Sequence, residues 1–427
     1  MTPQSQSHDE SRPGRERPAR LSVDLATPEP IPAEGIRAAA ALMESGALFR
    51  YAEIDEIGSP VAALESEFGT RVGRRYAVAV NSCGAALYMG LHCLDVGPTE
   101  AVLLNSWTLA PVPGAVAHVG AKPVFVETGE DLTIDLNDLR VRAAEYQGSV
   151  LLLSHMRGHI ANMTEVTAIC HEHGLRLVED CAHSLGGTWD GQATGTFGEV
   201  GCFSTQTYKH LNSGEGGLLV TDDEEIAARA ILASGSYRLH AQHTSRPPLD
   251  RFEPFLDQEP NHSMRMNAIA AAVLLPQLPL LEDRISRWRM LYDRLARGLR
   301  DIEGIRLPRR DGREHFVGSS LQFWVTGSDH AGIARFCTVA DELGVHVKWF
   351  GAHRPAGFTS NYRSWSYASA SNLPRTDTLL AGLCDLRLPL ALDEAGCDHV
   401  VEILGYALQE ARATPKHPGE IHEEGTT

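Results

Sequence analysis

One lysine lies among small and hydroxyl residues in the stretch STQTYKHLNSGEGG, residues 204–217. Lys209 comes shortly after the apolar run GCFST, residues 201–205, which is typical of a buried strand. Partial desolvation at such a place lowers the pKa of an ammonium group and leaves the neutral amine free to attack an aldehyde. Lys209 is therefore a candidate Schiff-base lysine, and the alternative is an ordinary exposed loop lysine.

Asp180 is the second residue that could take part in chemistry. It ends the apolar run RLVED, residues 176–180, directly after Glu179. A carboxylate at the end of a buried strand needs a cationic or hydrogen-bonding partner, and a protonated pyridine nitrogen would serve. The alternative interpretation is a helix cap for the segment that follows.

A phosphate-binding turn is also expected. The segment NSCGAAL, residues 81–87, places small residues at the start of a helix that follows the strand YAVAV, residues 76–80. Free backbone N–H groups and the helix dipole bind anions at such a place. Ser204 can add a hydroxyl from the strand before Lys209.

Seven short apolar runs separated mostly by helix-length segments predict a buried, mostly parallel sheet, and hence an α/β fold. The runs cover residues 76–80, 101–105, 122–127, 149–154, 176–180, 201–205 and 216–221. In such a sheet the ligand binds beyond the carboxyl ends of the strands, where Asp180 and Lys209 are expected. Beyond residue 265 the pattern becomes helical, and Pro276 and Pro279 should interrupt the helix.

The domain organisation follows from these patterns. We expect a large domain over residues 21–275 and a smaller α+β domain over 276–412. Residues 1–20 and 413–427 have the composition of disordered tails. The segment 240–260 is either a loop that covers the substrate or a solvated insertion.

Composition excludes several classes of protein. The 427 residues carry a formal net charge of -17, which argues against binding nucleic acid or anionic membranes. No apolar stretch could span a bilayer or serve as a signal peptide, so a cytoplasmic location is expected. The eight scattered cysteines indicate reduced thiols. The four histidines in HMRGH and HEHG lack a zinc-binding spacing, and no metal is expected.

Three segments together resemble one family. They are VEDCAHSLGG, GTFGEVGCFSTQTYKHLNSGEGGLLVTDD and NHSMRMNAIAAAVLLPQL, and the likeness extends from about residue 30 to 411. They resemble the DegT/StrS family of pyridoxal-phosphate-dependent sugar and cyclitol aminotransferases, which have the aspartate aminotransferase fold (fold type I). The resemblance implies pyridoxal 5'-phosphate as the cofactor and a homodimer with shared active sites.

The resemblance also implies roles for individual residues. Lys209 would form the Schiff base, Asp180 would pair with the pyridine nitrogen, and His183 would lie against the cofactor ring. Ser204, together with the backbone at Cys83 and Gly84, would hold the phosphate. In the segment that crosses to a second subunit, Asn261 would contact the neighbour's phosphate. The adjacent Arg265 is either part of this contact or a structural ion-pair residue.

Three positions depart from the family pattern. His210 stands where the family has asparagine, and Gly84 stands where it has threonine. Leu109 occupies the position of an aromatic residue that stacks on the cofactor ring, and Trp107 is a candidate to replace it. These differences affect the choice of substrate more than the choice of cofactor.

The predicted function is transfer of an amino group from glutamate or glutamine to a keto sugar or keto cyclitol, in amino-sugar or antibiotic biosynthesis. Two alternatives remain open. One is a sugar dehydratase that uses pyridoxamine phosphate, in which a histidine replaces the lysine. The other is a non-catalytic regulator that keeps the same fold.

Overall fold

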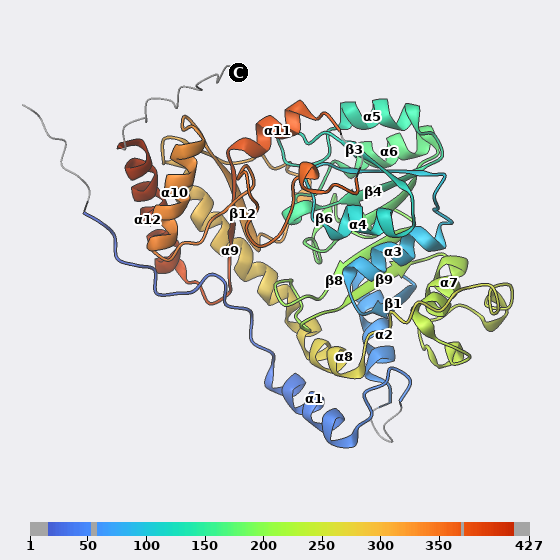
Figure 1. Cartoon of the computed structure of the whole chain (residues 1–427). Coiled ribbons are helices and arrows are strands. Elements are labelled where there is room, and N and C mark those ends of the chain that lie inside the picture. Colours follow the sequence, from blue (N-terminus) through green and yellow to red (C-terminus); the bar gives the residue numbers. More distant parts are fainter. Residues whose placement is uncertain (1–15, 53–57, 369–370, 414–427) are drawn as a thin grey trace, which may run out of the picture.

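The computed structural model describes residues 16–52, 58–368 and 371–413. A seven-stranded sheet forms its centre, in the order β1-β9-β8-β5-β4-β2-β3 (Figure 1). The strands are β1 Tyr76–Val80, β2 Ala101–Asn105, β3 Lys122–Val126, β4 Val150–Ser154, β5 Arg176–Asp180, β8 Val200–Ser204 and β9 Gly217–Thr221. Only β9 runs antiparallel to its neighbours in this sheet. The predicted α/β fold with a mostly parallel seven-stranded sheet is confirmed.

Helices cover both faces of this sheet, which explains why its strands are continuously apolar. The helices are α2 Pro60–Val72, α3 Cys83–Cys93, α4 Pro111–His118, α5 Leu136–Glu145, α6 Met163–His173, α7 Glu224–Gly235 and α8 Ala268–Leu274. Neighbouring residues of one strand face opposite layers. Val102 packs with α3, α4 and α7, whereas Leu103 packs with α5 and α6. Under β1 and β8, Ala77 and Phe203 pack with α2 and α8.

The two prolines break the helix where the sequence predicts. Helix α8 ends at Leu274, and the 3₁₀ segment η4, Leu275–Leu280, contains both Pro276 and Pro279. Helix α9, Leu281–Arg300, then carries the chain toward the smaller lobe (Figure 1). A proline lacks the N–H that would continue the helical ladder, so the break has a local cause.

The smaller lobe is built on a four-stranded antiparallel sheet in the order β10-β12-β14-β13. Its elements are β10 Ile305–Arg306, β12 Ser320–Val325, α10 His330–Glu342, β13 Lys348–Trp349, α11 Pro374–Ala381, β14 Leu383–Arg387 and α12 Glu394–Ala413. A further three-stranded sheet joins β6 Thr188–Trp189, β7 Gln192–Ala193 and β11 Glu314–His315. The lobe is α+β, and the exact domain limits 21–275 and 276–412 stay predictions.

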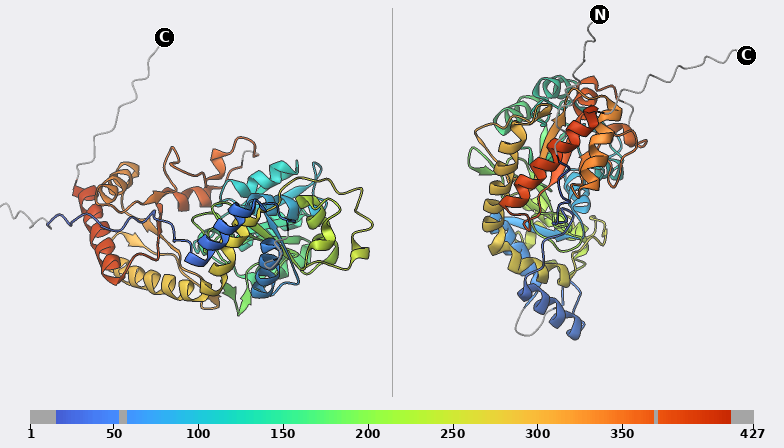
Figure 2. Two further views of the ribbon diagram at one scale, coloured as in Figure 1. Left: turned by 90° about the horizontal axis from the view of Figure 1, so that it is seen from below. Right: turned by 90° about the vertical axis from the view of Figure 1, so that its left-hand side faces the viewer.

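The N-terminal segment lies along the smaller lobe before it reaches α1, Ala33–Ser45 (Figure 2). The Leu21 amide donates to the Leu343 carbonyl at 2.8 Å, and Arg17 pairs with Glu342 at 3.3 Å. Part of the tail predicted over residues 1–20 is therefore in contact with the lobe. The rest of it, residues 1–15, and residues 414–427 lie outside the described residues.

Within the described ranges, no helix is both long enough and apolar enough to cross a membrane. The cytoplasmic location stays a prediction.

The start of α3 is held against the sheet at a point that admits no side chain. A Cβ added to Gly217 would lie 2.5 Å from the Ser82 carbonyl carbon and 2.6 Å from the Cys83 amide nitrogen. Gly217 pairs with Val80 on one side and Ser204 on the other. This glycine therefore sets how closely Ser204 approaches the first turn of α3.

We expect Gly217→Ala to lower the free energy of unfolding by about 1–3 kcal/mol, because backbone atoms must move to admit the methyl group. Urea unfolding followed by circular dichroism measures the change. Gly97→Ala is the matched control, since a Cβ at Gly97 has no neighbour within 4 Å. Equal stability of the two variants would contradict this account of Gly217.

Candidate active site

Asp180 is the centre of a hydrogen-bonded group at the carboxyl ends of three neighbouring strands. Its side chain accepts from the Ser154 hydroxyl at 2.8 Å and from the Ala182 amide at 3.1 Å. The Cys83 thiol lies 3.9 Å from the same carboxylate. Asn105, at the end of β2, accepts from the Ser154 amide at 2.9 Å and so orients Ser154.

Among the described residues this carboxylate is buried without an ion pair, although the ammonium form of Lys209 is near enough to interact with it electrostatically. Asp180 is 6% exposed, and none of the ion pairs in the described chain involves it. Its partners are a hydroxyl, an amide and a thiol, all neutral donors. Burial of an uncompensated carboxylate is costly, so the site suits a ligand that brings a positive charge. A protonated pyridine nitrogen fits this donor set.

Lys209 and His183 form the second part of the site. The Lys209 Nζ lies 2.7 Å from His183 Nε2. Burial and the nearby Arg157 guanidinium lower the pKa of Lys209 from its usual 10.5 to about 8. The pKa of His183 falls well below its usual value, first through burial and then through Lys209. His183 therefore stays neutral and accepts a hydrogen bond from the Lys209 amine.

The lowered pKa changes the reactivity of the lysine. A shift from 10.5 to about 8 raises the neutral fraction at pH 7 by roughly 300-fold. Only the neutral amine attacks a carbonyl carbon or accepts a proton from one. An amine with this lowered pKa can act as a nucleophile and as a base.

Donors for an anion lie at the first turn of α3. Ser82 caps the helix by accepting from the Ala85 amide at 3.0 Å. The amides of Cys83 and Gly84 have no acceptor among the residues that the structure describes. Ser204 is close to this turn through Gly217, and its hydroxyl accepts from the Gln206 amide at 3.3 Å. The arrangement fits a phosphate at a helix N-terminus.

Gly84 leaves space at this turn. A Cβ there would meet nothing nearer than the Ser82 hydroxyl at 3.7 Å. The hydroxyl-bearing residue that the family has at this position would therefore fit without clashing. Glycine at position 84 lacks the hydroxyl group that could bind an anion there, and the packing of the turn leaves space for one.

Trp107 and Leu109 belong to the same apolar cluster. Trp107 is 1% exposed and packs edge-on against Phe350 at 5.4 Å and against His159 at 6.0 Å. Its Nε1 is buried and has no partner within the described part of the chain. Leu109 is partly buried against this cluster. Which of the two faces the cofactor ring stays a prediction.

Asn261 lies on a strand-like segment beside β1 and is exposed. It accepts hydrogen bonds from Ser263, and no contact joins it to Lys209 or Asp180 in the described residues. Arg265 donates to the Gly235 carbonyl at 2.8 Å and lies over the rings of Phe49 and Tyr237. Across the ranges described it makes no ion pair, unlike the alternative interpretation from the sequence.

His210, which stands where the family has asparagine, does not face the amine of Lys209. His210 is buried, lies 3.0 Å from the Ser319 hydroxyl and packs against Trp288 at 5.2 Å. Burial and Lys209 lower its pKa to about 3, so it is neutral. Its contacts are with the smaller lobe, whereas the amine of Lys209 contacts His183.

Sequence reasoning missed three residues of the site. Asn105 and Ser154 end β2 and β4, so the rule that located Asp180 could have located them too. Arg157 lies in HMRGH, which the sequence analysis considered only as a metal-binding motif. No local pattern predicts that its charge lies near Lys209.

The carboxylate of Glu179 and the side chain of Phe252 have structural roles. His155 lies 3.1 Å from Glu179, whose carboxylate also accepts from the amides of Gly195, Phe197 and Gly198. These bonds occupy the carboxylate oxygens, so the buried group of His155, Glu179 and Cys181 is explained without a metal. In the segment 240–260, Phe252 is buried in the core beside α3 and α7 and anchors the segment, whose other residues are mostly exposed.

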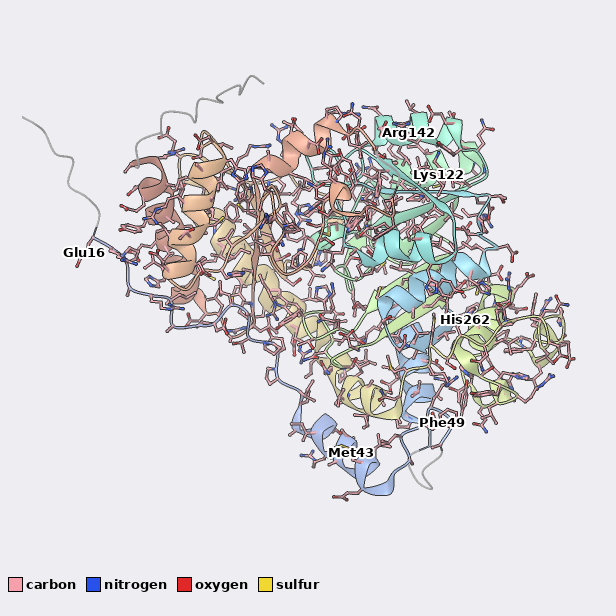
Figure 3. The ribbon with its side chains drawn as sticks, in the orientation of Figure 1. Glu16, Met43, Phe49, Lys122, Arg142 and His262 are labelled. Atoms are coloured by element: carbon pink, nitrogen blue, oxygen red, sulfur yellow. The ribbon has the colours of Figure 1, made fainter. Side chains whose placement is uncertain are left out.

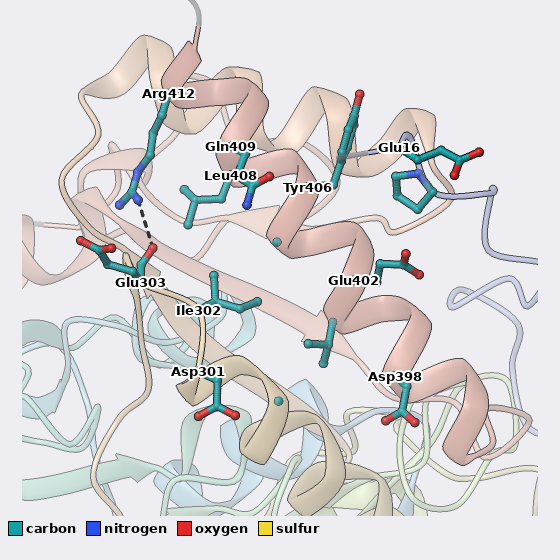
Figure 4. Close-up of a pocket in the computed structure, with 14 residues that line it drawn as sticks. Glu16, Asp301, Ile302, Glu303, Asp398, Glu402, Tyr406, Leu408, Gln409 and Arg412 are labelled. Carbon is teal, nitrogen blue, oxygen red and sulfur yellow. Dashed lines mark hydrogen bonds between the residues drawn. The ribbon is translucent and has the colours of Figure 1, made fainter. Parts of the chain in front are cut away.

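A cavity of about 710 Å³ lies away from the strand ends, in the smaller lobe between α9 and α12 (Figure 4). Acidic residues line it, among them Asp301, Asp398 and Glu402. At its edge Arg412 donates to the Glu303 carbonyl at 3.1 Å. None of the predicted site residues lines this cavity.

Comparison with known proteins agrees with this geometry. A model of the DegT/DnrJ/EryC1/StrS aminotransferase family matches residues 36–405. The chain belongs to that family. Aminotransferases of the family depend on pyridoxal phosphate.

Two curated members show the range of relatives. The chain is 32% identical over 264 residues to the spore coat polysaccharide biosynthesis protein SpsC of Bacillus subtilis, covering 60% of this chain and 66% of SpsC. It is 30% identical over 265 residues to a dTDP-3-amino-3,4,6-trideoxy-alpha-D-glucose transaminase of Micromonospora megalomicea, covering 61% and 67%. The chain spans about two thirds of the length of these relatives.

Solved structures of the family share the fold. A crystal structure of S. venezuelae DesV superposes with a TM-score of 0.73 at 25% identity. The match covers 90% of this chain and 95% of DesV. It includes both the seven-stranded sheet and the smaller lobe.

The lowered pKa of Lys209 can be tested by competitive amine labelling. The chain has four lysines, Lys122, Lys209, Lys348 and Lys416, so each falls on a separable peptide. In cofactor-free protein, trace acetylation read by mass spectrometry should show Lys209 reacting with a midpoint near pH 8. Exposed Lys122 serves as the internal control. Identical pH midpoints for the two lysines would show that the pocket does not lower the pKa of the Lys209 amine.

Proposed function

We propose that this protein is a pyridoxal-phosphate-dependent aminotransferase that moves an amino group from glutamate or glutamine to a keto sugar or keto cyclitol. One observation carries the proposal: a buried carboxylate without an ion pair in the described part of the chain, Asp180, shares a site with an amine of lowered pKa, Lys209. Membership of the family and its sugar aminotransferases support the choice of reaction and acceptor.

The residues present fit the cofactor. When bound, pyridoxal phosphate supplies an aldehyde that condenses with amines and a ring that stabilises negative charge on the adjoining carbon. Asp180 would hold the protonated ring nitrogen, with Ser154 fixing the carboxylate. The amides of Cys83 and Gly84, with the Ser204 hydroxyl, would hold the phosphate.

Lys209 carries the proton transfers. Its neutral Nζ takes the proton from the donor's α-carbon, and the ammonium group then returns a proton during the reaction. His183 accepts a hydrogen bond from Nζ and stays neutral, so it orients the amine without competing for the charge. In the second half of the cycle the same amine moves protons in the reverse direction on the keto acceptor.

The structure favours this function over its two alternatives. A dehydratase of this fold would carry a histidine in place of the lysine, but here the amine of Lys209 contacts His183 while His210 contacts Ser319. A regulator without activity needs no amine with a lowered pKa beside a buried acid. Both observations support transamination.

We further infer that two copies of the chain share the active sites. Asn261 is exposed and free of contact with the site of its own chain. Helix α1 and the residues after it present Ile36, Met43 and Phe49, which are 57%, 58% and 46% exposed; Figure 3 labels Met43 and Phe49. The Phe49 ring lies under the guanidinium of Arg265, four residues after Asn261. Apolar side chains gathered in this way are typical of a subunit interface.

Replacement of Lys209 tests the function. We expect the purified protein to absorb between about 400 and 430 nm and to lose this band with glutamate or glutamine. Lys209→Ala should abolish both the band and amino transfer, because no amine then holds the aldehyde. Lys122→Ala, at an exposed position, should change neither property. A borohydride-stable link to the cofactor in Lys209→Ala would refute the assignment.

Mixing two inactive variants tests the shared sites. Lys209→Ala and Asn261→Ala subunits, mixed and allowed to exchange, should regain up to about a quarter of the wild-type activity. In a hybrid dimer one site receives Lys209 from one chain and Asn261 from the other, and both are intact. Activity assays before and after exchange measure the recovery. No recovery, with exchange shown by native mass spectrometry, would indicate that Asn261 acts within its own subunit.

A further inference from the structure

Arg157 occupies an unusual position at the edge of the site. It lies in the 3₁₀ turn η1, Met156–Gly158, which begins two residues after Ser154 ends β4. Its φ of 54° and ψ of 24° place a non-glycine residue in the left-handed region. Residues held in this region often belong to functional sites. The next residue touches the segment of His183, since a Cβ on Gly158 would lie 2.9 Å from the His183 carbonyl oxygen.

The smaller lobe fixes the Arg157 side chain. Its Nη2 pairs with the Asp385 carboxylate of β14 at 2.8 Å. The Gln322 amide of β12 donates to the other oxygen of Asp385 at 2.7 Å, and the Gln322 oxygen lies 2.8 Å from His159 Nε2. Asp385, Gln322 and His159 are all buried. The ion pair therefore joins the two lobes and holds the guanidinium in one place.

The ion pair uses only part of the guanidinium. The Nε of Arg157 is buried and has no hydrogen-bond partner in the described ranges. A guanidinium offers five N–H donors in a fixed fork, so one contact to Asp385 leaves most of them unused. The Phe358 ring covers it, with its centre 5.0 Å from the guanidinium carbon. A second planar anion would satisfy these donors.

We propose that Arg157 binds the α-carboxylate of the amino donor. The proposal rests on the function proposed above and names the residue that recognises this substrate. The donor's amine must reach the atom that Lys209 holds, and its carboxylate is one carbon away from that amine. The anion must therefore lie close to Lys209 and His183, where η1 places the guanidinium.

Electrostatics support this placement. Arg157 is close enough to Lys209 and His183 to lower the pKa of both. The same positive field favours a bound carboxylate. Glutamate and glutamine both carry the α-carboxylate, so the proposal applies to either donor. A planar fork also suits a carboxylate better than a point charge does.

Calorimetry with unreactive donors tests the proposal. The probes are 2-methyl-L-glutamate and 2-methyl-L-glutamine, which lack the α-hydrogen, each compared with its 1-amide. Holoenzyme should bind each acid at least roughly tenfold more tightly than its amide. In Arg157→Gln this preference should disappear, and in Arg157→Lys part of it should remain, since the charge is kept but the fork is lost. In donor kinetics, KM should rise more than kcat falls.

The control is Arg74→Gln, which removes another largely buried arginine that forms an ion pair outside the site, Arg74 with the more exposed Asp222 at 2.8 Å. This variant should keep the full preference for the acids. The proposal is overturned if Arg157→Gln keeps the wild-type preference, even with both ligands bound more weakly, because the ion pair is then only structural. If Arg157→Gln does not fold, an unchanged preference in Arg157→Lys overturns it equally. The proposal also fails if Arg157→Gln raises the KM for the acceptor and leaves the KM for the donor unchanged.

These outcomes differ from failure of the proposed function. If wild-type protein binds none of the probes and shows no half-reaction with any amino donor, the aminotransferase assignment fails and this proposal with it. If wild type prefers the acids and so does Arg157→Gln, only the role of Arg157 is wrong.

Discussion

The site depends on one buried carboxylate that neutral groups surround. Asp180 accepts hydrogen bonds from the Ser154 hydroxyl and the Ala182 amide and contacts the Cys83 thiol, but it forms no ion pair in the described residues. Such an arrangement orients the carboxylate without neutralising its charge. The carboxylate can therefore still attract a cationic ligand. This carboxylate is shielded from water and held in one position by the ends of the strands, the first turn of α3 and the two lobes.

The sequence predicted this part of the molecule well because strands of a parallel sheet carry a strong local signal. The seven apolar runs match the seven strands within a residue or two at each end, and Pro276 and Pro279 interrupt the helix as expected. Asp180 and Lys209 could be found because Asp180 ends such a strand and Lys209 follows another. Asp180 is buried, and Lys209 has a lowered pKa, as expected for these residue types at the ends of buried strands.

Other residues could not be predicted because their partners lie far away in the chain. Arg157 pairs with Asp385, 228 residues later, and no local pattern records that contact. His210 directly follows Lys209 in the sequence, but the backbone turns its ring toward Ser319 and Trp288. Trp107 and Leu109 share one apolar cluster, so sequence spacing could not separate their roles.

The scarcity of lysine has a chemical consequence for a protein that handles carbonyl compounds. Of the 38 basic residues, all but four are arginine, whose guanidinium does not form imines under ordinary conditions. The cation-bearing surface is thus almost inert toward aldehydes and reducing sugars. A chain built this way offers few side-chain amines to stray carbonyl compounds, and one of these few, Lys209, lies in the site.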